Sequence, residues 1–300
     1  MIQIDDLCKN YRNKTALSNV SLQIPYGVYG LIGSKKSGKT TLLKILAALE
    51  PFSNGDVAIY EYNLKIQKRQ IQSIVGYLPQ KFDFFPNMTI NEAMSYFFDL
   101  KDPKDEAIVK ETDIEDCLSY VQLTDEANLK VNQLTPGQKQ RLGIAQAFLC
   151  DPKFVILDEP TAELDTQERI QFLSLLSKIR DDRIVLMSTS RIKDIKAVCK
   201  NFAVLKDGMM QFSGNPEEYA HSLTKEVYSI IIKRELLAQF VKHVNVISLK
   251  QVDGKLKLRY MNVADEKIKL NSLSKQVAPT MVDAYAYFTG SWITEERLIR

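Results

Sequence analysis

The stretch GSKKSGKTT, residues Gly33–Thr41, constrains the fold of this 300-residue chain more than any other feature. It fits the pattern G-x-x-x-x-G-K-[ST] and follows a short apolar run, Val28–Ile32. Leucines at helical spacing come directly after it: Leu42, Leu43, Leu46 and Leu49. A loop between a strand and a helix turns backbone N–H groups inward, and the helix N-terminus adds partial positive charge. We therefore predict a strand–loop–helix unit that holds phosphate.

Individual residues of this loop suit a nucleoside triphosphate and its metal ion. Lys39 can reach the β- and γ-phosphates, and the Thr40 hydroxyl can ligate Mg²⁺. Gly33 and Gly38 allow backbone angles and close approaches that a Cβ would hinder. The rest of the predicted phosphate-binding set is Ser34, Lys35, Lys36, Ser37 and Thr41. One alternative is a chance match in an unrelated loop, which the strand–loop–helix context disfavours. Another is that Lys35 and Lys36 are solvated charges, which is the preferred interpretation for Lys35.

Two carboxylates about 120 residues later complete the predicted site. The apolar run Phe154–Leu157 is typical of a strand buried on both faces of a parallel sheet, and Asp158, Glu159 and Pro160 follow it. Ligands bind at the carboxyl edge of such a sheet. Asp158 is suited to hold Mg²⁺, and Glu159 to orient or deprotonate an attacking water. An acidic strand end that caps a helix is the less favoured alternative.

Composition and charge exclude several functional classes. The chain has 40 Lys+Arg and 37 Asp+Glu residues, and this net charge of +3 predicts no nucleic-acid partner. Its four cysteines form no CxxC pair, so neither a disulfide framework nor a zinc site is expected. No segment approaches the roughly 20 apolar residues of a membrane span, and the N-terminus does not resemble a signal peptide. We expect a cytoplasmic protein that serves a membrane only through a partner.

The pattern along the chain predicts an α/β architecture in two parts. Short alternating segments before residue 32 read as strands, and apolar runs alternate with helical segments up to about residue 215. Residues 82–150 look mostly helical. After Asn215–Pro216 the sequence pattern changes to strand-like apolar runs, and Asp253–Gly254 is a hairpin signal. Residues 217–300 are therefore expected to form a small separate α+β unit.

The order of five motifs resembles the ATP-binding cassette (ABC) family over about residues 1–215. The loop and the carboxylate pair correspond to its Walker A and Walker B motifs. Three others are GYLPQ at 76–80, similar to the Q-loop, LTPGQKQR at 134–141, similar to the signature segment, and AELD at 162–165, similar to the D-loop. The resemblance implies a P-loop NTPase cassette at residues 1–216. Its fold would be a mostly parallel sheet with an N-terminal antiparallel subdomain and a helical subdomain.

The same resemblance implies roles for residues outside the loop. Tyr11 would stack on adenine, with a plain surface tyrosine as an equal alternative. Gln80 would contact Mg²⁺ and the γ-phosphate. Three signature residues would face a nucleotide held by a second subunit: Thr135, Gly137 and Gln138. Asp165 would touch that partner. The expected cofactors are ATP and Mg²⁺, and the expected assembly is a homodimer or heterodimer of cassettes.

Two further segments resemble parts of the family that serve a membrane partner. The tail Val277–Tyr285 is similar to that of ABC-2 exporter cassettes, with a generic regulatory or dimer-stabilising extension as the alternative. Phe82, Phe84 and Phe85 follow the Q-loop, where the family receives a coupling helix from the permease; ordinary core aromatics are the alternative. These features imply ATP-driven export through a separate integral-membrane permease. The chain would then lie peripherally on the inner face of the cell membrane.

One departure from the family pattern concerns hydrolysis. Ser190 stands where the family has its switch histidine, after the apolar run Ile184–Met187. Losing one aligned donor to the transition state costs about 10²–10³ in rate, whereas nucleotide binding should suffer less. Turnover is therefore expected to be low. The alternative function is an ATP-binding but weakly hydrolysing cassette, which regulates or joins an active cassette in a heterodimer; the intact Glu159 argues against a fully inactive site.

Other departures concern the loop and the dimer seam. Pro136 replaces a signature glycine and removes one N–H, although Thr135 and Gln138 still predict a helix with a capping box. Lys36 replaces a loop glycine, which costs roughly 1 kcal/mol if φ is positive, unless its charge helps to hold phosphate. Within the D-loop, Glu163 adds charge near the expected dimer seam.

Overall fold

In the computed structural model, a six-stranded sheet brings together the ends of the strands that precede the loop and the carboxylate pair. Its strands, in spatial order, are β10 (Met209–Gly214), β9 (Asn201–Lys206), β3 (Gly27–Ile32), β8 (Ile184–Thr189), β7 (Phe154–Asp158) and β6 (Val75–Leu78). β3 pairs in parallel with β8 and β9, and β7 with β6 and β8. Every residue of β7 and β8 is buried, as predicted for strands covered on both faces.

The structure describes residues 1–12, 14–101, 107–179, 182–262 and 274–293. They fall into two units, which divide between Ser213 and Gly214. The sequence places the boundary slightly later, after residue 216, and the assignment of two separate domains stays a prediction. Of the predicted C-terminal unit, residues 263–273 and 294–300 lie outside the described residues.

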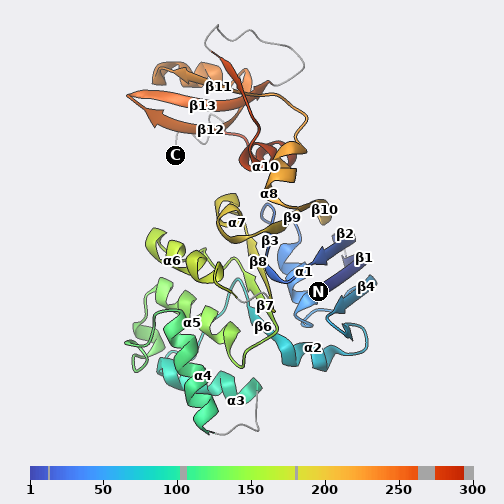
Figure 1. Ribbon diagram of the computed structural model, residues 1–300, viewed down its shortest axis with the longest axis vertical. Coiled ribbons are helices and arrows are strands. Elements are labelled where there is room, and N and C mark those ends of the chain that lie inside the picture. The colour runs from blue at the N-terminus through green and yellow to red at the C-terminus, as the bar shows by residue number, and fades with distance from the viewer. Residues whose placement is uncertain (13, 102–106, 180–181, 263–273, 294–300) are drawn as a thin grey trace. The chain divides into compact units, whose positions relative to one another are not determined.

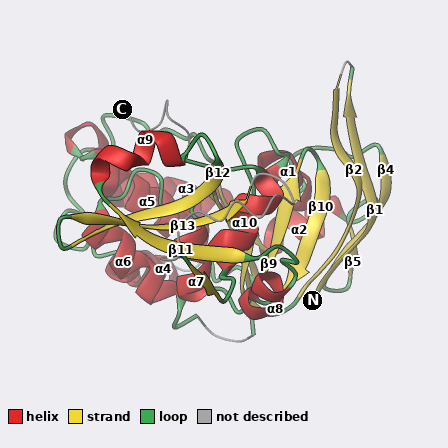
Figure 2. Cartoon of the chain, turned by 90° about the horizontal axis from the view of Figure 1, so that it is seen from above, coloured by secondary structure: helices red, strands yellow, loops and turns green. Residues whose placement is uncertain are grey.

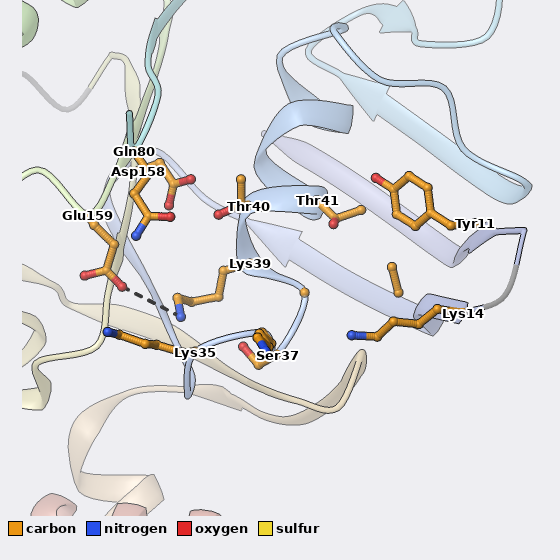
Figure 3. Close-up of a pocket in the computed structure, with 13 residues that line it drawn as sticks. Tyr11, Lys14, Lys35, Ser37, Lys39, Thr40, Thr41, Gln80, Asp158 and Glu159 are labelled. Carbon is orange, nitrogen blue, oxygen red and sulfur yellow. Dashed lines mark ion pairs between the residues drawn. The ribbon is translucent and has the colours of Figure 1, made fainter. Parts of the chain in front are cut away.

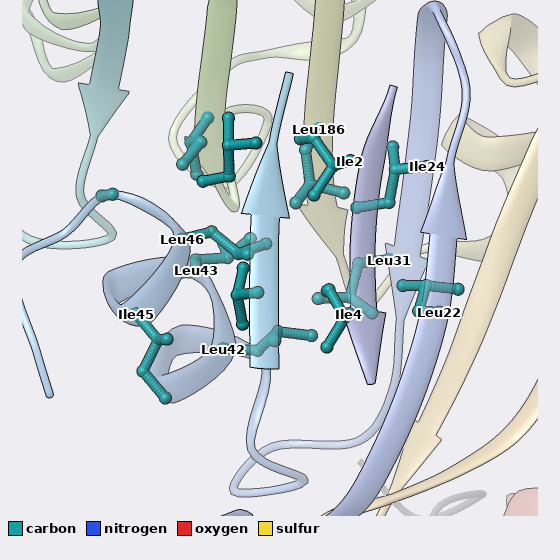
Figure 4. Packing of buried hydrophobic residues seen from close by; sticks show 14 of the residues in the cluster. Ile2, Ile4, Leu22, Ile24, Leu31, Leu42, Leu43, Ile45, Leu46 and Leu186 are labelled. Atoms are coloured by element: carbon teal, nitrogen blue, oxygen red, sulfur yellow. The ribbon is translucent and has the colours of Figure 1, made fainter. Parts of the chain in front are cut away.

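A second, antiparallel sheet contains the first strands of the chain. Its order is β2 (Lys14–Ile24), β1 (Ile2–Tyr11), β4 (Asn54–Ile59) and β5 (Tyr62–Asn63). Helix α1 (Lys39–Leu46) packs its leucines into one core with both sheets, for example with Ile4 and Leu186 (Figure 4). The predicted placement of Leu49 on this apolar side is wrong, because the helix ends at Leu46 and Leu49 is 54% exposed.

Helices complete the first unit, and those of the predicted helical segment lie together. In chain order they are α2 (Lys68–Ile74), α3 (Ile90–Lys101), α4 (Ala107–Tyr120), the 3-10 turn η1 (Val131–Gln133), α5 (Pro136–Phe148), α6 (Thr166–Leu176) and α7 (Ile192–Val198). Figure 1 shows α3, α4 and α5 together beside the edge of the sheet that ends in β6. The parallel sheet, the antiparallel sheet and these helices confirm the predicted α/β cassette architecture.

The second unit has a four-stranded antiparallel sheet with its own apolar core. Its order is β12 (Val244–Val252), β13 (Lys255–Asn262), β11 (Val227–Ile232) and β14 (Lys275–Val277), and Figure 2 shows the three longer strands side by side. Asp253 and Gly254 form the predicted hairpin turn, both with positive φ. The helices are α8 (Pro216–His221), η2 (Arg234–Leu236), α9 (Leu237–Phe240) and α10 (Met281–Thr289). Within the described residues, none of the chain's helices is both long and apolar enough to cross a membrane.

Candidate active site

The predicted phosphate loop connects β3 to α1 and has the backbone geometry that its glycines suggest. Gly38 has φ +107, and a Cβ on it would lie 2.7 Å from the carbonyl oxygen of Ala16. A Cβ on Gly33 would collide with the Leu205 carbonyl oxygen. Lys39 is the first residue of α1, so the backbone N–H groups of this helix end face the loop. This backbone geometry suits an anion, and the assignment of these residues to phosphate binding stays a prediction.

Lys39 is 7% exposed and lies at the centre of the loop. Its Nζ donates hydrogen bonds to the carbonyl oxygens of Gly33 (2.7 Å) and Ser34 (3.1 Å), and it lies 3.7 Å from Glu159 Oε1 (Figure 3). Burial lowers the pKa of the Lys39 ammonium below its ordinary value, while the Glu159 and Asp158 carboxylates oppose that shift. A triphosphate in this loop would supply the negative charge that a desolvated ammonium requires.

The two carboxylates lie at the end of β7, beside this loop. Asp158 is 1% exposed, and its Oδ1 accepts a hydrogen bond from Ser188 Oγ at 2.6 Å. Glu159 follows in a left-handed conformation, with φ +53. Its Oε2 accepts hydrogen bonds from the Ser190 backbone N–H (3.1 Å) and from Ser190 Oγ (3.4 Å). Glu159 thus bridges the loop lysine and the residue in the predicted switch position.

The donor set fits a Mg²⁺ ion. Among the described residues, Asp158 Oδ2 is a buried oxygen without a hydrogen-bond partner, and so is the hydroxyl of Ser37. Asp158 lines the same pocket as the hydroxyl of Thr40 and the amide of Gln80. No group of three His, Cys, Asp or Glu side chains that could hold a metal occurs in the part of the chain that the structure describes. One carboxylate, a hydroxyl and substrate phosphates are the ligands by which proteins usually hold Mg²⁺.

The pocket has a volume of about 450 Å³ and brings most of the predicted residues together. Its walls are formed by Tyr11, Lys14, Ala16, Lys35, Lys36, Ser37, Gly38, Lys39, Thr40, Thr41, Gln80, Asp158 and Glu159. Gly33, Ser34 and Ser190 join it through their contacts with Lys39 and Glu159. Lys14 and Ser188 were missed at the sequence level. The signal for Ser188 was the polar end of an otherwise apolar strand, Ile184–Thr189.

Tyr11 lies at the far side of the pocket from Lys39 and is 43% exposed (Figure 3). Lys9, which does not line the pocket, has its Nζ 4.8 Å from the centre of the Tyr11 ring. That ammonium is itself held by Glu50 (3.0 Å) and by the carbonyl oxygen of Pro51 (2.6 Å). The ring therefore has a cation on one side and presents aromatic surface to the pocket, an arrangement that suits stacking on a base.

The signature residues lie at the N-terminus of α5, outside this pocket. Thr135 caps the helix and Pro136 occupies its first turn, and the capping box predicted with Gln138 is confirmed: Thr135 Oγ1 accepts from the Gln138 N–H at 3.2 Å, and Gln138 Oε1 accepts from the Thr135 N–H at 2.9 Å. A Cβ on Gly137 would collide with the Glu168 carboxylate. That these residues face the nucleotide of a second subunit stays a prediction, as does the contact of Asp165, which caps α6.

Lys36 has φ +67, so the left-handed conformation considered for this position is present. Lys36→Gly should therefore stabilise the chain by about 0.5–1 kcal/mol, because glycine adopts this conformation without the Cβ penalty. Chemical denaturation of the nucleotide-free protein measures the effect. The matched control is Lys35→Gly, since Lys35 is not among the residues with positive φ and should lose stability. Equal losses for both variants would contradict the prediction.

Comparisons with known proteins agree with this geometry. The family profile described as ABC transporter matches residues 17–162. The ABC transporter ATP-binding protein YxlF of Bacillus subtilis (strain 168) is 32% identical over 237 residues, which is 79% of this chain and 78% of YxlF. The methionine import ATP-binding protein MetN of Desulfitobacterium hafniense (strain Y51) is also 32% identical, over 79% of this chain and 73% of MetN.

Solved structures give the same result. The dimeric structure of MJ0796, a bacterial ABC transporter cassette, is 27% identical with a TM-score of 0.66, and covers 72% of this chain and 98% of MJ0796. The same cassette, with the same values, is known in a dimeric post-hydrolysis state with ADP and Pi. ABC transporter complexes pair such cassettes and join them to permease subunits. The chain belongs to the ABC transporter family and is an ATP-binding cassette ATPase, the ATP-binding subunit of an ABC transporter.

Proposed function

We propose that this chain is the motor subunit of an exporter, in which ATP binding and hydrolysis drive transport through a separate integral-membrane permease. The observation that carries the proposal is the single pocket in which Lys39, Asp158 and Glu159 meet. A phosphate-binding ammonium, a metal-binding carboxylate and a second carboxylate for the attacking water are the parts that phosphoryl transfer to water requires.

In this proposal each side chain has one task. The loop N–H groups and Lys39 hold the phosphates, and Tyr11 stacks on the adenine. Asp158, Thr40 and Gln80 would hold Mg²⁺, which would supply positive charge to offset that of the phosphate oxygens. Glu159 orients a water and accepts its proton as the water oxygen bonds to the γ-phosphorus and the bond to the ADP oxygen breaks. The partner cassette closes the site with residues equivalent to Thr135, Gly137 and Gln138.

The direction of transport rests on the tail, which resembles that of ABC-2 exporter cassettes. In the second unit this tail runs from Val277, the last residue of β14, into the first part of α10. Its Asp283 is fully buried and accepts hydrogen bonds from Arg259 Nη2 (2.6 Å) and Nε (3.1 Å), and Thr280 caps the helix. The tail therefore has a defined role in the fold of its unit. Since relatives such as MetN are named as import proteins, ATP-dependent flux in inside-out membrane vesicles is the measurement that decides direction.

The permease contact is proposed at the aromatic side chains after the Q-loop. Phe84 is buried, but Phe85 is 51% exposed and packs edge-on against Tyr96, which is 40% exposed, with ring centroids 5.5 Å apart. An exposed aromatic pair of this kind suits a partner helix. Pull-down of the tagged chain from detergent-solubilised membranes should recover an integral-membrane protein, and Phe85→Ala together with Tyr96→Ala should reduce its recovery. Unchanged recovery by this double variant would place the contact elsewhere.

One observation favours the second candidate, a weakly hydrolysing regulatory cassette. Ser190 holds Glu159 through its backbone N–H and a long hydroxyl contact, and it places no ionisable donor beside the γ-phosphate position. We expect Ser190→His to raise kcat for ATP hydrolysis tenfold or more, because a restored donor is worth about 10²–10³ in rate where it is well aligned. Steady-state ATPase of the purified chain measures this. A wild-type rate no higher than that of Glu159→Gln would favour the regulatory candidate over the motor.

A further inference from the structure

Ser188 is a completely buried serine that contacts the Asp158 carboxylate and the backbone of Glu159. It lies on β8 in register with Asp158 on β7, the neighbouring parallel strand. Its Oγ donates a hydrogen bond to Asp158 Oδ1 at 2.6 Å and accepts one from the Glu159 backbone N–H at 2.9 Å. The first bond lies at the short end of the range for a hydroxyl donor and an oxygen acceptor.

The first contact fixes the orientation of the Asp158 carboxylate. With Oδ1 occupied by Ser188, Oδ2 is the oxygen left buried and without a partner among the described residues. Buried polar atoms are normally satisfied, so an orphaned carboxylate oxygen beside a phosphate loop points to a ligand. A hydrogen bond from a neighbouring side chain to a metal-binding carboxylate holds that carboxylate in one orientation and tunes its affinity for the ion.

The second contact fixes the backbone that presents Glu159. This residue has φ +53, a conformation that costs about 1 kcal/mol or more for a residue with a Cβ and that persists only when its surroundings hold it. The hydrogen bond from the Glu159 N–H to Ser188 supplies such a restraint. From this backbone the side chain reaches both Lys39 and Ser190.

We propose that Ser188 is a positioning residue that sets both carboxylates for catalysis: it leaves Asp158 Oδ2 free for the metal and holds the backbone of Glu159 in place. The inference rests on the proposed roles of Asp158 and Glu159. The two hydrogen bonds given for the Ser188 hydroxyl go to the Asp158 carboxylate and come from the Glu159 main-chain N–H, so both involve the residues proposed to act in catalysis.

The test compares Ser188→Ala with Ser188→Thr, which keeps the hydroxyl, in the full-length chain. We expect Ser188→Ala to raise the free Mg²⁺ concentration for half-maximal ATPase activity about tenfold and to lower kcat, with a much smaller change in affinity for ATP in EDTA. A second readout is Mn²⁺ binding, followed by its EPR signal, with a non-hydrolysable ATP analogue present. The Mn²⁺ affinity should fall about tenfold in Ser188→Ala and recover in Ser188→Thr.

Thr189→Val is the matched control, because Thr189 is equally buried and its hydroxyl accepts only from the Arg191 N–H among the described contacts. It should keep wild-type Mg²⁺ and Mn²⁺ dependence. If Ser188→Ala keeps them as well, or if Thr189→Val shifts them equally, the positioning role is overturned. A different result would overturn the proposed function itself: Asp158→Asn that leaves metal binding unchanged together with Glu159→Gln that leaves kcat unchanged. The inference about Ser188 would then fail with it.

Discussion

Replacing Glu159 with glutamine should lower kcat for ATP hydrolysis about a thousandfold while leaving the affinity for ATP nearly unchanged. The glutamine keeps the shape of the side chain and its contact with the Ser190 N–H, but it cannot accept a proton from water. The Glu159 carboxylate lies 3.7 Å from Lys39, beside the loop. Among the described residues, Asp158 is the only other carboxylate that lines the pocket, so no further carboxylate is in place to accept the proton. Single-turnover ATPase and calorimetric ATP titration of the same preparation measure the two quantities.

Glu115→Gln provides the control for this change. Glu115 is an exposed residue of α4, far along the chain from the loop and outside the pocket, so the same chemical change there should not alter kcat. A kcat for Glu159→Gln within about tenfold of the wild type would contradict the general-base role. The attacking water would then have to be oriented by backbone groups instead. Tighter association of the variant in ATP would in addition support a nucleotide-sandwiched dimer.

Features encoded by neighbouring residues could be predicted from the sequence. The phosphate loop, the hairpin at Asp253–Gly254 and the capping box at Thr135 each depend on residues within a few positions of one another. Local rules are sufficient there, since the same residues determine both the backbone angles and the hydrogen bonds. The buried strand before Asp158 was predictable for the same reason, as an uninterrupted apolar run.

Features that depend on strand register could not be predicted. Ser188 and Asp158 are 30 residues apart, and only the pairing of β7 with β8 places one opposite the other. Lys9 meets Glu50 through a comparable long-range approach. Leu49 shows the converse error: its spacing continued the helical pattern, but the chain turns at Ala48, whose φ is +56, and the leucine stays exposed. Periodicity identifies a helix more reliably than it identifies the residue at which the helix ends.

Removing the ammonium of Lys39 should have the largest effect on nucleotide binding. Lys39→Ala should raise the Kd for Mg·ATP at least a hundredfold, since each charge-assisted hydrogen bond to phosphate contributes about 1.5–3 kcal/mol. The loss has a second component in this chain. Lys39 faces Glu159 and Asp158, so without the ammonium these carboxylates would repel the incoming phosphates. Equilibrium titration with Mg·ATP, with the stability of each variant followed in parallel, measures the change.

Lys35→Ala separates this specific effect from a general loss of positive charge at the loop. Lys35 lines the same pocket but is exposed, so its charge is screened by water and the expected change in Kd is only a few-fold. Equal effects of the two variants would mean that the loop attracts nucleotide by diffuse charge, and an unchanged Kd for Lys39→Ala would remove the basis of the site. A loss confined to Lys39 would instead mean that the buried ammonium exchanges the carbonyl oxygens of Gly33 and Ser34 for phosphate oxygens when ATP binds.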